Sequence, residues 1–329
     1  MTVTCQRATR AGLACAAARW LIGLADPGAS ASPGTAQEPQ VFRSGASGVA
    51  VDVNVRDRNR RPITGLKADD FEVLDNGVPQ QIEEISYAKR PIDVTVALDV
   101  SHSVTGVMIE RLRRGVTDLM GDLGREDRLK PMLFNLSIMR TVDFTTDTKL
   151  VGNAIKAATP GGGTALLDTI AVAAASPTAS DRRHLIVIFT DGADSSSVTS
   201  PASLAITAQR SRATLAFVLP ATSLPTVLTS STSTSRTSTT IIRGQSFMTP
   251  PRPFDSLFQD LARDTGGQIV PAAANADLSS TFRQVLDAFR SSYVLLYNAR
   301  GVERGGYHTL EVKVKREGAV VTARRGYFQ

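Results

Sequence analysis

Hydrophobic and polar residues alternate with a period of two near both ends of the chain, as they do in strands that bury one face. Near the N-terminal end, Asp75-Asn-Gly77 is a hairpin sequence, because Asn-Gly accepts positive φ angles. Each end offers only two or three such strands, and a two-stranded hairpin is marginal in water. We therefore expect the two ends to pair into one small antiparallel β-sandwich. The predicted strands cover residues 49–55, 71–74, 82–87, 293–297, 308–315 and 320–323.

The pattern changes between residues 91 and 292, where short continuous apolar runs alternate with segments of helical period. Such runs are typical of strands buried on both faces, and their alternation with helices indicates a mostly parallel sheet with helices on both sides. The predicted class is therefore α/β, inserted between the two halves of the sandwich, with Asp277 capping the last helix. Strands are expected near residues 93–99, 129–136, 139–143, 184–190, 214–219 and 268–270, and helices near 104–122, 147–157, 164–175, 200–211, 254–264 and 276–291.

The first 31 residues have the features of a secretory signal: Arg7 and Arg10, then an Ala/Leu-rich run that Arg19 interrupts, and the small-residue series Ala29-Ser-Ala31. We therefore expect an extracytoplasmic protein, located in the periplasm, in the cell envelope or outside the cell. Removal of this segment would also remove Cys5 and Cys15, and with them any disulfide. No other stretch approaches the roughly 18 apolar residues that a membrane span needs, so no span is expected after signal removal.

Two further segments lack the apolar residues that a core needs. Residues 32–46, rich in Pro, Gly, Ser and Ala, are predicted to be a linker, and the Ser/Thr-rich residues 222–253 a loop within the α/β unit. The predicted domain organisation is a signal at 1–31, a linker at 32–46, a β unit at 47–90, the α/β domain at 91–292 and a second β unit at 293–329.

Composition and charge exclude two classes of protein. A content of 42% hydrophobic and 21% charged residues is ordinary for a globular protein and excludes global disorder. The net charge is +6, but the basic residues are scattered among acidic ones and lack interleaved aromatic residues that could stack on bases. A nucleic-acid partner is therefore not expected.

Five polar residues follow predicted strands or open predicted helices of the α/β unit. Asp99 ends the first strand of this unit, and Ser101 and Ser103 follow it at a spacing of two. Thr164 follows a glycine-rich loop, and Asp191 comes directly after another strand. The carboxyl ends of parallel strands meet at one edge of a sheet, where ligands gather. Each residue alone is also typical of a helix N-cap, but three segments in this order predict a divalent-cation site.

The donor set also predicts how such a site would behave. Two carboxylates and three hydroxyls are hard oxygen ligands, which suit Mg²⁺. Because hydroxyls are weak neutral ligands, the cation would remain electrophilic and would attract an anionic group from outside. Asp194, a few residues after Asp191, is open to two interpretations, an acid behind the ligands or a polar loop residue.

In the order Asp-x-Ser-x-Ser, Thr, Asp, these residues resemble the metal-ion-dependent adhesion site of the von Willebrand factor A domain, a fold shared with integrin inserted domains. The resemblance covers residues 91–292. It implies a Rossmann-like domain that binds Mg²⁺ or Mn²⁺, with Ca²⁺ as a further candidate, and captures a Glu or Asp of a protein partner. The family usually has Gly between the two serines, where this chain has His102. His102 would either clash with the partner or titrate near neutral pH and tune the site.

The flanking β segments add a second resemblance. Residues 62–77, which include Phe71-Glu-Val-Leu-Asp-Asn-Gly77, and the terminal Arg325-Gly-Tyr-Phe328 are similar to the von Willebrand A-related proteins abundant in Acidobacteria. That group is typically exported, and the resemblance implies an architecture more than a mechanism.

We therefore expect an exported binding or adhesion protein and not an enzyme. The first alternative is a structural envelope protein whose metal site is degenerate or only stabilising. The second is a metal-assisted hydrolase, for which His102 is the nearby general-base candidate. No Gly-x-Ser-x-Gly or His-Glu-x-x-His motif supports the hydrolase. The partner's identity and the oligomeric state are not predicted.

Overall fold

The computed structural model of the chain describes residues 48–104, 106–220, 255–273 and 277–329. The predicted signal at 1–31, the linker at 32–46 and the Ser/Thr-rich tract at 222–253 lie outside these residues and remain predictions. The domain boundaries drawn at residues 91 and 292 also remain predictions.

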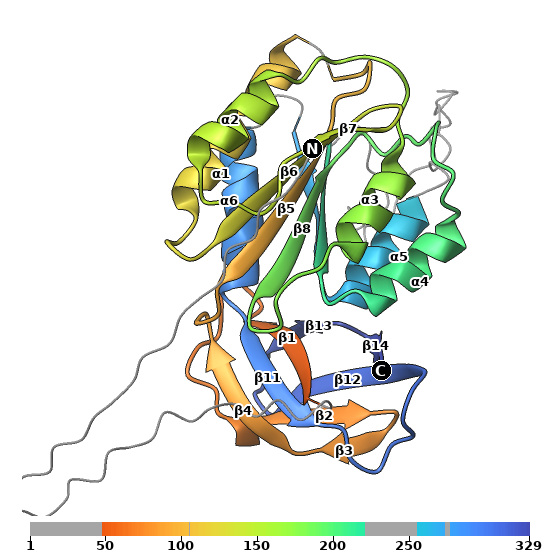
Figure 1. Ribbon diagram of the computed structural model, residues 1–329. Helices are drawn as coiled ribbons and strands as arrows, with labels where there is room; N and C mark the ends of the chain where they lie inside the picture. The colour runs from red at the N-terminus through yellow and green to blue at the C-terminus, as the bar shows by residue number, and fades with distance from the viewer. Residues whose placement is uncertain (1–47, 105, 221–254, 274–276) are drawn as a thin grey trace, which may run out of the picture. The chain divides into compact units, whose positions relative to one another are not determined.

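Within the described residues, the middle of the chain forms a six-stranded sheet in the order β10-β9-β8-β5-β6-β7 (Figure 1). All neighbours are parallel except β6 and β7, which are joined by a loop too short for a parallel crossover. The central strand β5 is buried at every position, including the polar residues Asp93, Thr95 and Asp99, as expected for a strand covered on both faces. The strands are β5 Ile92–Asp99, β6 Arg128–Phe134, β7 Ile138–Thr141, β8 Arg183–Phe189, β9 Thr214–Pro220 and β10 Gln268–Ala272.

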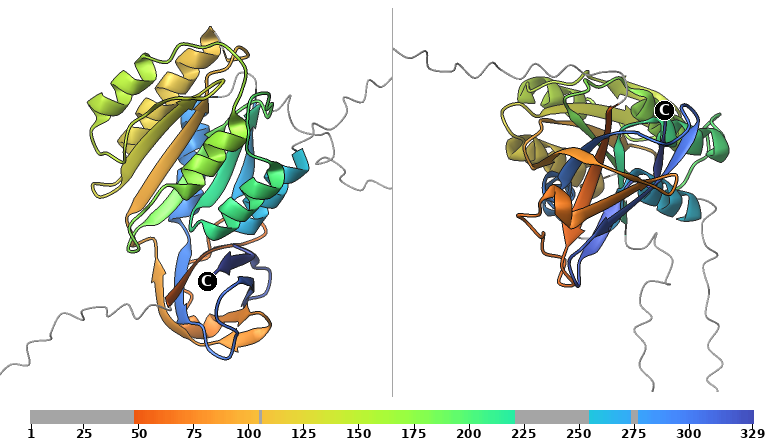
Figure 2. Two further views of the ribbon diagram at one scale, coloured as in Figure 1. Left: turned by 45° about the vertical axis from the view of Figure 1, so that its right-hand side comes forward. Right: turned by 90° about the horizontal axis from the view of Figure 1, so that it is seen from below.

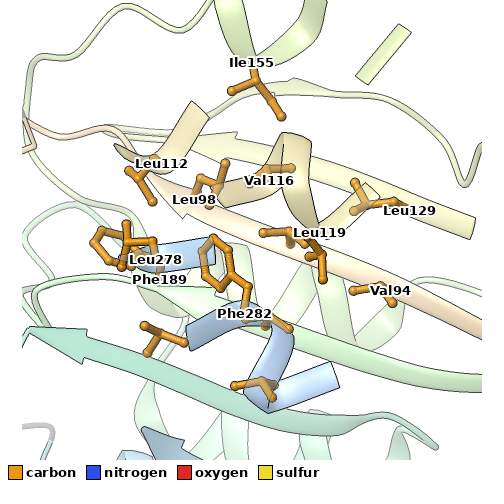
Figure 3. Close-up of a cluster of buried hydrophobic side chains, with 14 of the residues drawn as sticks. Val94, Leu98, Leu112, Val116, Leu119, Leu129, Ile155, Phe189, Leu278 and Phe282 are labelled. Atoms are coloured by element: carbon orange, nitrogen blue, oxygen red, sulfur yellow. The ribbon is translucent and has the colours of Figure 1, made fainter. Parts of the chain in front are cut away.

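Helices cover both faces of this sheet, so the predicted α/β class is confirmed (Figure 1). One core cluster joins the sheet to α1, α2 and α6, and a second joins it to α3, α4 and α5. In the first cluster, Leu112 and Val116 of α1 and Phe282 of α6 contribute to one apolar core (Figure 3). The helices are α1 Val107–Asp122, α2 Thr148–Lys156, α3 Leu166–Ala175, α4 Pro201–Arg210, α5 Asp255–Thr265 and α6 Leu278–Arg290.

Several helices begin at side-chain caps that the local sequence supplies. Asp147 accepts hydrogen bonds from the backbone nitrogens of Lys149 and Leu150 at the start of α2. Ser200 caps α4 in the same way, directly before a proline at the first helical position. Asp277 caps α6, which confirms the prediction for that helix.

The strands outside the central sheet form two four-stranded antiparallel sheets in the described part of the chain, ordered β13-β1-β11-β4 and β14-β12-β2-β3. Each sheet combines strands from both ends of the chain, with β1 beside β11 and β2 beside β12 (Figure 2). They share one apolar core, so the predicted pairing of the two ends is confirmed. The strands are β1 Gly48–Arg56, β2 Phe71–Asp75, β3 Val78–Gln80, β4 Ile82–Tyr87, β11 Tyr293–Asn298, β12 Tyr307–Val314, β13 Val320–Ala323 and β14 Gly326–Phe328.

A buried polar cluster also connects the two ends. Asp75 on β2 is fully buried and accepts hydrogen bonds from the hydroxyls of Tyr297 and Tyr327, each at 2.8 Å. Its other oxygen lies 2.8 Å from Nδ1 of His308 on β12. Burial and the bond to Asp75 raise the pKa of both tyrosine hydroxyls, so they remain donors. This cluster gives a structural reason for Asp75 and Tyr327, one residue from each of the two end segments.

None of the helices in the ranges that the structure describes is long and apolar enough to cross a membrane.

Candidate metal centre

The five candidate residues lie at the carboxyl edge of the central sheet or in loops bonded to it. Strands β5 and β8 are parallel neighbours with Leu98 opposite Phe189, so the residues that follow each strand emerge side by side. The hydroxyl of Thr190 donates a hydrogen bond to Oδ2 of Asp99 at 2.8 Å. This bond joins the end of β5 to the residue directly before Asp191.

Asp99, Ser101 and Ser103 form the first group. Oδ1 of Asp99 accepts a hydrogen bond from the backbone nitrogen of Ser101 at 2.9 Å, which folds the loop back over the strand end. The hydroxyls of Ser101 and Ser103 lie 3.1 Å apart. Asp99 and Ser101 are buried, whereas Ser103 is exposed. The side-chain oxygens of these three residues therefore lie in a row from the interior to the surface.

The carboxyl group of Asp99 has an electrostatic environment that a cation would improve. Burial raises its pKa above the ordinary value, and the negative charge of Asp191 acts in the same direction. Hydrogen bonds from Ser101 and Thr190 act against this rise. No Lys or Arg forms an ion pair with Asp99 among the described residues. A divalent cation would supply the missing positive charge, so the residues present fit the predicted ion.

Thr164 is buried and lies on a loop bonded to the Ser101 loop. The backbone nitrogen of His102 donates to the carbonyl of Gly162 at 3.2 Å, and that of Gly161 donates to the carbonyl of Val100 at 3.0 Å. Gly162 has φ of 75°, a left-handed conformation that favours glycine. His102 itself is exposed, so its side chain is available at the surface beside the candidate ligands.

Asp191 lies on a loop that is bonded to Thr164. The backbone nitrogens of Ser195 and Ser196 donate to the carbonyl of Thr164 at 2.9 and 3.1 Å. The backbone nitrogen of Thr164 donates in turn to the hydroxyl of Ser195 at 2.9 Å. Oδ1 of Asp191 accepts a hydrogen bond from the backbone nitrogen of Ala193 at 3.0 Å. All three segments of the candidate set are thus connected by hydrogen bonds.

The alternative interpretation of the five residues as helix caps is not what the structure shows. The residues at the N-cap positions of α1, α3 and α4 are Gly106, Ala165 and Ser200. Asp99 and Asp191 instead bond to the backbone two residues further along their own loops.

In the described ranges, no group of three or more His, Cys, Asp or Glu residues is suited to a metal. The candidate ligand set therefore relies on its hydroxyl oxygens as well as its two carboxylates. Sequence reasoning missed one neighbour of the set, Thr190, which fixes the second oxygen of Asp99. Its position directly before Asp191 was the available signal. The sequence analysis also left open the role of Asp194, which accepts hydrogen bonds from the first backbone nitrogens of α3.

Comparison with known proteins gives one family and several distant structures. Residues 93–248 match the model of the von Willebrand factor type A domain, a range that includes all five candidate residues. No curated protein sequence matches the chain.

The similar solved structures include a von Willebrand factor type A protein from Catenulispora acidiphila, with 13% identity, a TM-score of 0.46 and coverage of 87% of this chain and 75% of that one. An aerotolerance-related membrane protein from Bacteroides fragilis has 18% identity and a TM-score of 0.43, over 60% of this chain and 98% of that one. Proximal thread matrix protein 1 from the mussel byssus, with a zinc-occupied MIDAS motif, has 12% identity and a TM-score of 0.43, over 60% of this chain and 48% of that one. Similarity at this level carries no statement about the function of the present chain.

The sequence match and the helix-covered, mostly parallel sheet agree with the expected family, whereas the acidobacterial resemblance of the flanks remains a prediction. Residues 93–248 in the middle of the chain thus match the von Willebrand factor type A domain family, and antiparallel strands from both ends of the chain flank this domain.

Proposed function

We propose that this chain is an exported binding protein that holds Mg²⁺ or Mn²⁺ through Asp99, Ser101, Ser103, Thr164 and Asp191. Its partner is a protein that offers a Glu or Asp carboxylate to the bound ion. The family of the domain, the donor set and the predicted signal segment support the proposal together. Export rests on residues 1–31, which lie outside the described part of the chain.

The observation that carries the proposal is the environment of Asp99. Its carboxylate is fully buried, receives hydrogen bonds only from neutral donors among the described residues, and is repelled by Asp191. Burying a charge without a counter-charge is costly. The hydroxyls of Ser101 and Ser103 lead outward from this carboxylate, so an ion held there would face the surface and a partner.

Hydroxyl donors also favour capture of a carboxylate. They carry no charge, so the protein would neutralise the ion only through Asp99 and Asp191. An ion with such ligands retains affinity for a further anionic oxygen. The bound ion would therefore supply the attraction for the partner, while the loops around Ser103 and Thr164 would decide which partner fits.

The proposal is for binding and not for catalysis. A hydrolase would need a general base beside the ion, for which His102 is the candidate. The structure holds only the backbone of His102, through its bond to Gly162, and the side chain is exposed. A catalytic base is normally oriented by a neighbouring group, and no hydrogen bond within the described residues orients this imidazole.

Thermal unfolding of the full chain tests the proposal. The protein is stripped with chelator and melted with and without Mg²⁺, beside Asp99→Asn and Asp147→Asn. An ion at a hundredfold excess over its dissociation constant stabilises the folded state by about 2.7 kcal/mol, which for a domain of this size raises Tm by roughly 5–10 °C. Asn at position 99 keeps the size of the side chain and removes its charge: its carbonyl oxygen can still accept from Ser101, and its amide nitrogen can donate to the hydroxyl oxygen of Thr190.

The wild type and Asp147→Asn should gain the full shift, because Asp147 caps α2 and is not one of the candidate ligands. Asp99→Asn should gain little or none. Equal shifts in all three proteins, or no shift in the wild type, would refute metal binding at this set and leave the structural role as the better explanation.

A further inference from the structure

Helix α3, which directly follows Thr164, has no cap of its own. Ala165 lies at its N-cap position and offers no side-chain acceptor. The first backbone nitrogens of a helix need acceptors, and Ala is among the poorest residues for this task. The acceptor comes instead from the loop that follows β8. Oδ1 of Asp194 receives hydrogen bonds from the nitrogens of Leu166 at 2.8 Å and Leu167 at 3.2 Å.

The helix returns equivalent bonds to the same loop. Asp168, in the first turn of α3, accepts from the backbone nitrogens of Val198 at 3.1 Å and Thr199 at 2.8 Å. Ser197 lies between the two acids, because its hydroxyl donates to Asp194 at 2.6 Å and accepts from the nitrogen of Asp168 at 3.1 Å. Residues 194–199 and the start of α3 are thus cross-linked in both directions, and we call this arrangement the 194–199 clamp.

The clamp extends to Thr164 itself. Both backbone polar groups of Thr164 are engaged, the nitrogen by the hydroxyl of Ser195 and the carbonyl by the nitrogens of Ser195 and Ser196. The packing at this point is tight. A Cβ atom added at Gly163 would lie 2.5 Å from Oγ of Ser195 and 2.8 Å from Oγ of Ser196. The position of Thr164 is therefore fixed by the loop that begins at Asp191.

Such an arrangement matters most for a site built from weak ligands. Each hydroxyl contributes little to the binding of a hard cation, so affinity depends on ligands that are already in place before the ion arrives. Partners that orient ligands from behind typically change metal affinity by about 10–100-fold. Thr164 and Asp191 come from different loops, and the clamp is a direct connection between those loops.

We propose that the 194–199 clamp, through Asp194 and Ser195, fixes Thr164 relative to Asp191 and thereby sets the affinity of the site for Mg²⁺. This inference rests on the proposed function, since it assigns an affinity to that same site. Asp194 and Ser195 act as positioning residues and not as ligands. The clamp also assigns a role to the Asp194-Ser-Ser-Ser197 sequence beyond that of a polar loop.

Two substitutions of Asp194 separate positioning from charge. Asp194→Ala and Asp194→Asn both remove the negative charge, but only Asn keeps an oxygen that can accept from Leu166 and Leu167. Titration of the chelator-stripped full chain with Mg²⁺ in a calorimeter should give about tenfold weaker binding for Asp194→Ala. Asp194→Asn should remain within about threefold of the wild type, because Asn and Asp are nearly equal as helix caps.

Matched variants distinguish the clamp from a general loss of stability. Asp147→Ala removes the same kind of cap from α2, so it should lower the melting temperature of the metal-free protein in a similar way but leave Mg²⁺ affinity unchanged. Ser195→Ala should weaken Mg²⁺ binding, since it removes the acceptor for the nitrogen of Thr164. Ser196→Ala should weaken it less, because the hydroxyl of Ser196 contacts that of Ser195 at 3.3 Å, whereas Ser196 reaches Thr164 itself through its backbone nitrogen.

The results that overturn the inference are distinct from those that overturn the proposed function. Equal weakening by Asp194→Ala and Asp194→Asn would show that the charge acts and not the position. Unchanged affinity in Asp194→Ala and Ser195→Ala would show that the clamp has no influence on the ion. A wild type without any Mg²⁺ binding would refute the proposed function, and the assigned affinity with it.

Discussion

The protonation of His184 should make this protein sensitive to mild acid. His184 lies on β8 at 3% exposure, with Nε2 2.8 Å from the hydroxyl of Thr95 and the ring edge-on to Phe144. Burial lowers its pKa from 6.5 to about 4, and Lys130 acts in the same direction, although Asp93 opposes both. The folded protein therefore holds this imidazole in its neutral form.

The sign and size of the effect follow from the difference between the pKa of His184 in the folded and unfolded protein. The folded state binds the proton less tightly than the unfolded chain, so stability is lost as pH falls from about 6.5 towards about 4 and is unaffected above that window. A shift from 6.5 to about 4 corresponds to about 3.4 kcal/mol when protonation is complete, and to roughly 2 kcal/mol at pH 5.

Urea unfolding of the wild type and His184→Gln between pH 8 and pH 5 measures this contribution. Gln does not titrate, and its amide can bond to Thr95. The free energy of unfolding of the wild type should fall relative to that of the variant by about 2 kcal/mol between pH 7 and pH 5. Contributions of the other histidines cancel in the difference. Parallel curves over the whole range would refute the assignment of a neutral, buried His184.

Two further predictions concern packing. Tyr327→Phe removes one donor to buried Asp75 and should lower the free energy of unfolding by about 1–3 kcal/mol in urea titrations; an effect no larger than experimental error would show that the cluster does not stabilise the sandwich. Gly115→Val should destabilise by about 1–3 kcal/mol, because a Cβ there would lie 3.0 Å from the ring of Phe282, whereas Gly152→Val, with nothing within 4 Å, should stay within about 0.5 kcal/mol. Equal effects of the two glycine variants would contradict the close approach of α1 and α6.

Elements with a strong period could be predicted from the sequence, and short ones could not. The mostly apolar segment of β5 and the Asp277 cap of α6 are local signals, and both appear where they were expected. Strands β3 and β14 were not predicted, since each has only three residues, which is too few for a period-two pattern. Their places depend on pairing. β3 pairs with β2 across a turn, and β14 pairs with β12, from which β13 separates it in the chain.

The candidate site shows the same limit. The sequence identifies which residues carry oxygen donors and that they follow strands, so the five candidates could be named without a structure. The contact between Thr190 and Asp99 joins the residue after β8 to the last residue of β5, so it depends on the register of these two strands. The role of Asp194 could not be read locally either, because it caps a helix that begins 28 residues earlier in the chain.

The pairing of the two chain ends has a consequence for how the protein holds together. Val53 of β1 lies opposite Tyr293 of β11, so the hydrogen-bonded ladder closes a loop that contains the entire type A domain. No cysteine occurs after residue 15, so no disulfide can close this loop within the described chain. The sandwich takes the place of such a crosslink, restricting the freedom of the unfolded segment between its halves. Because β1 pairs with β11, this closure can form only after synthesis has passed Tyr293–Asn298.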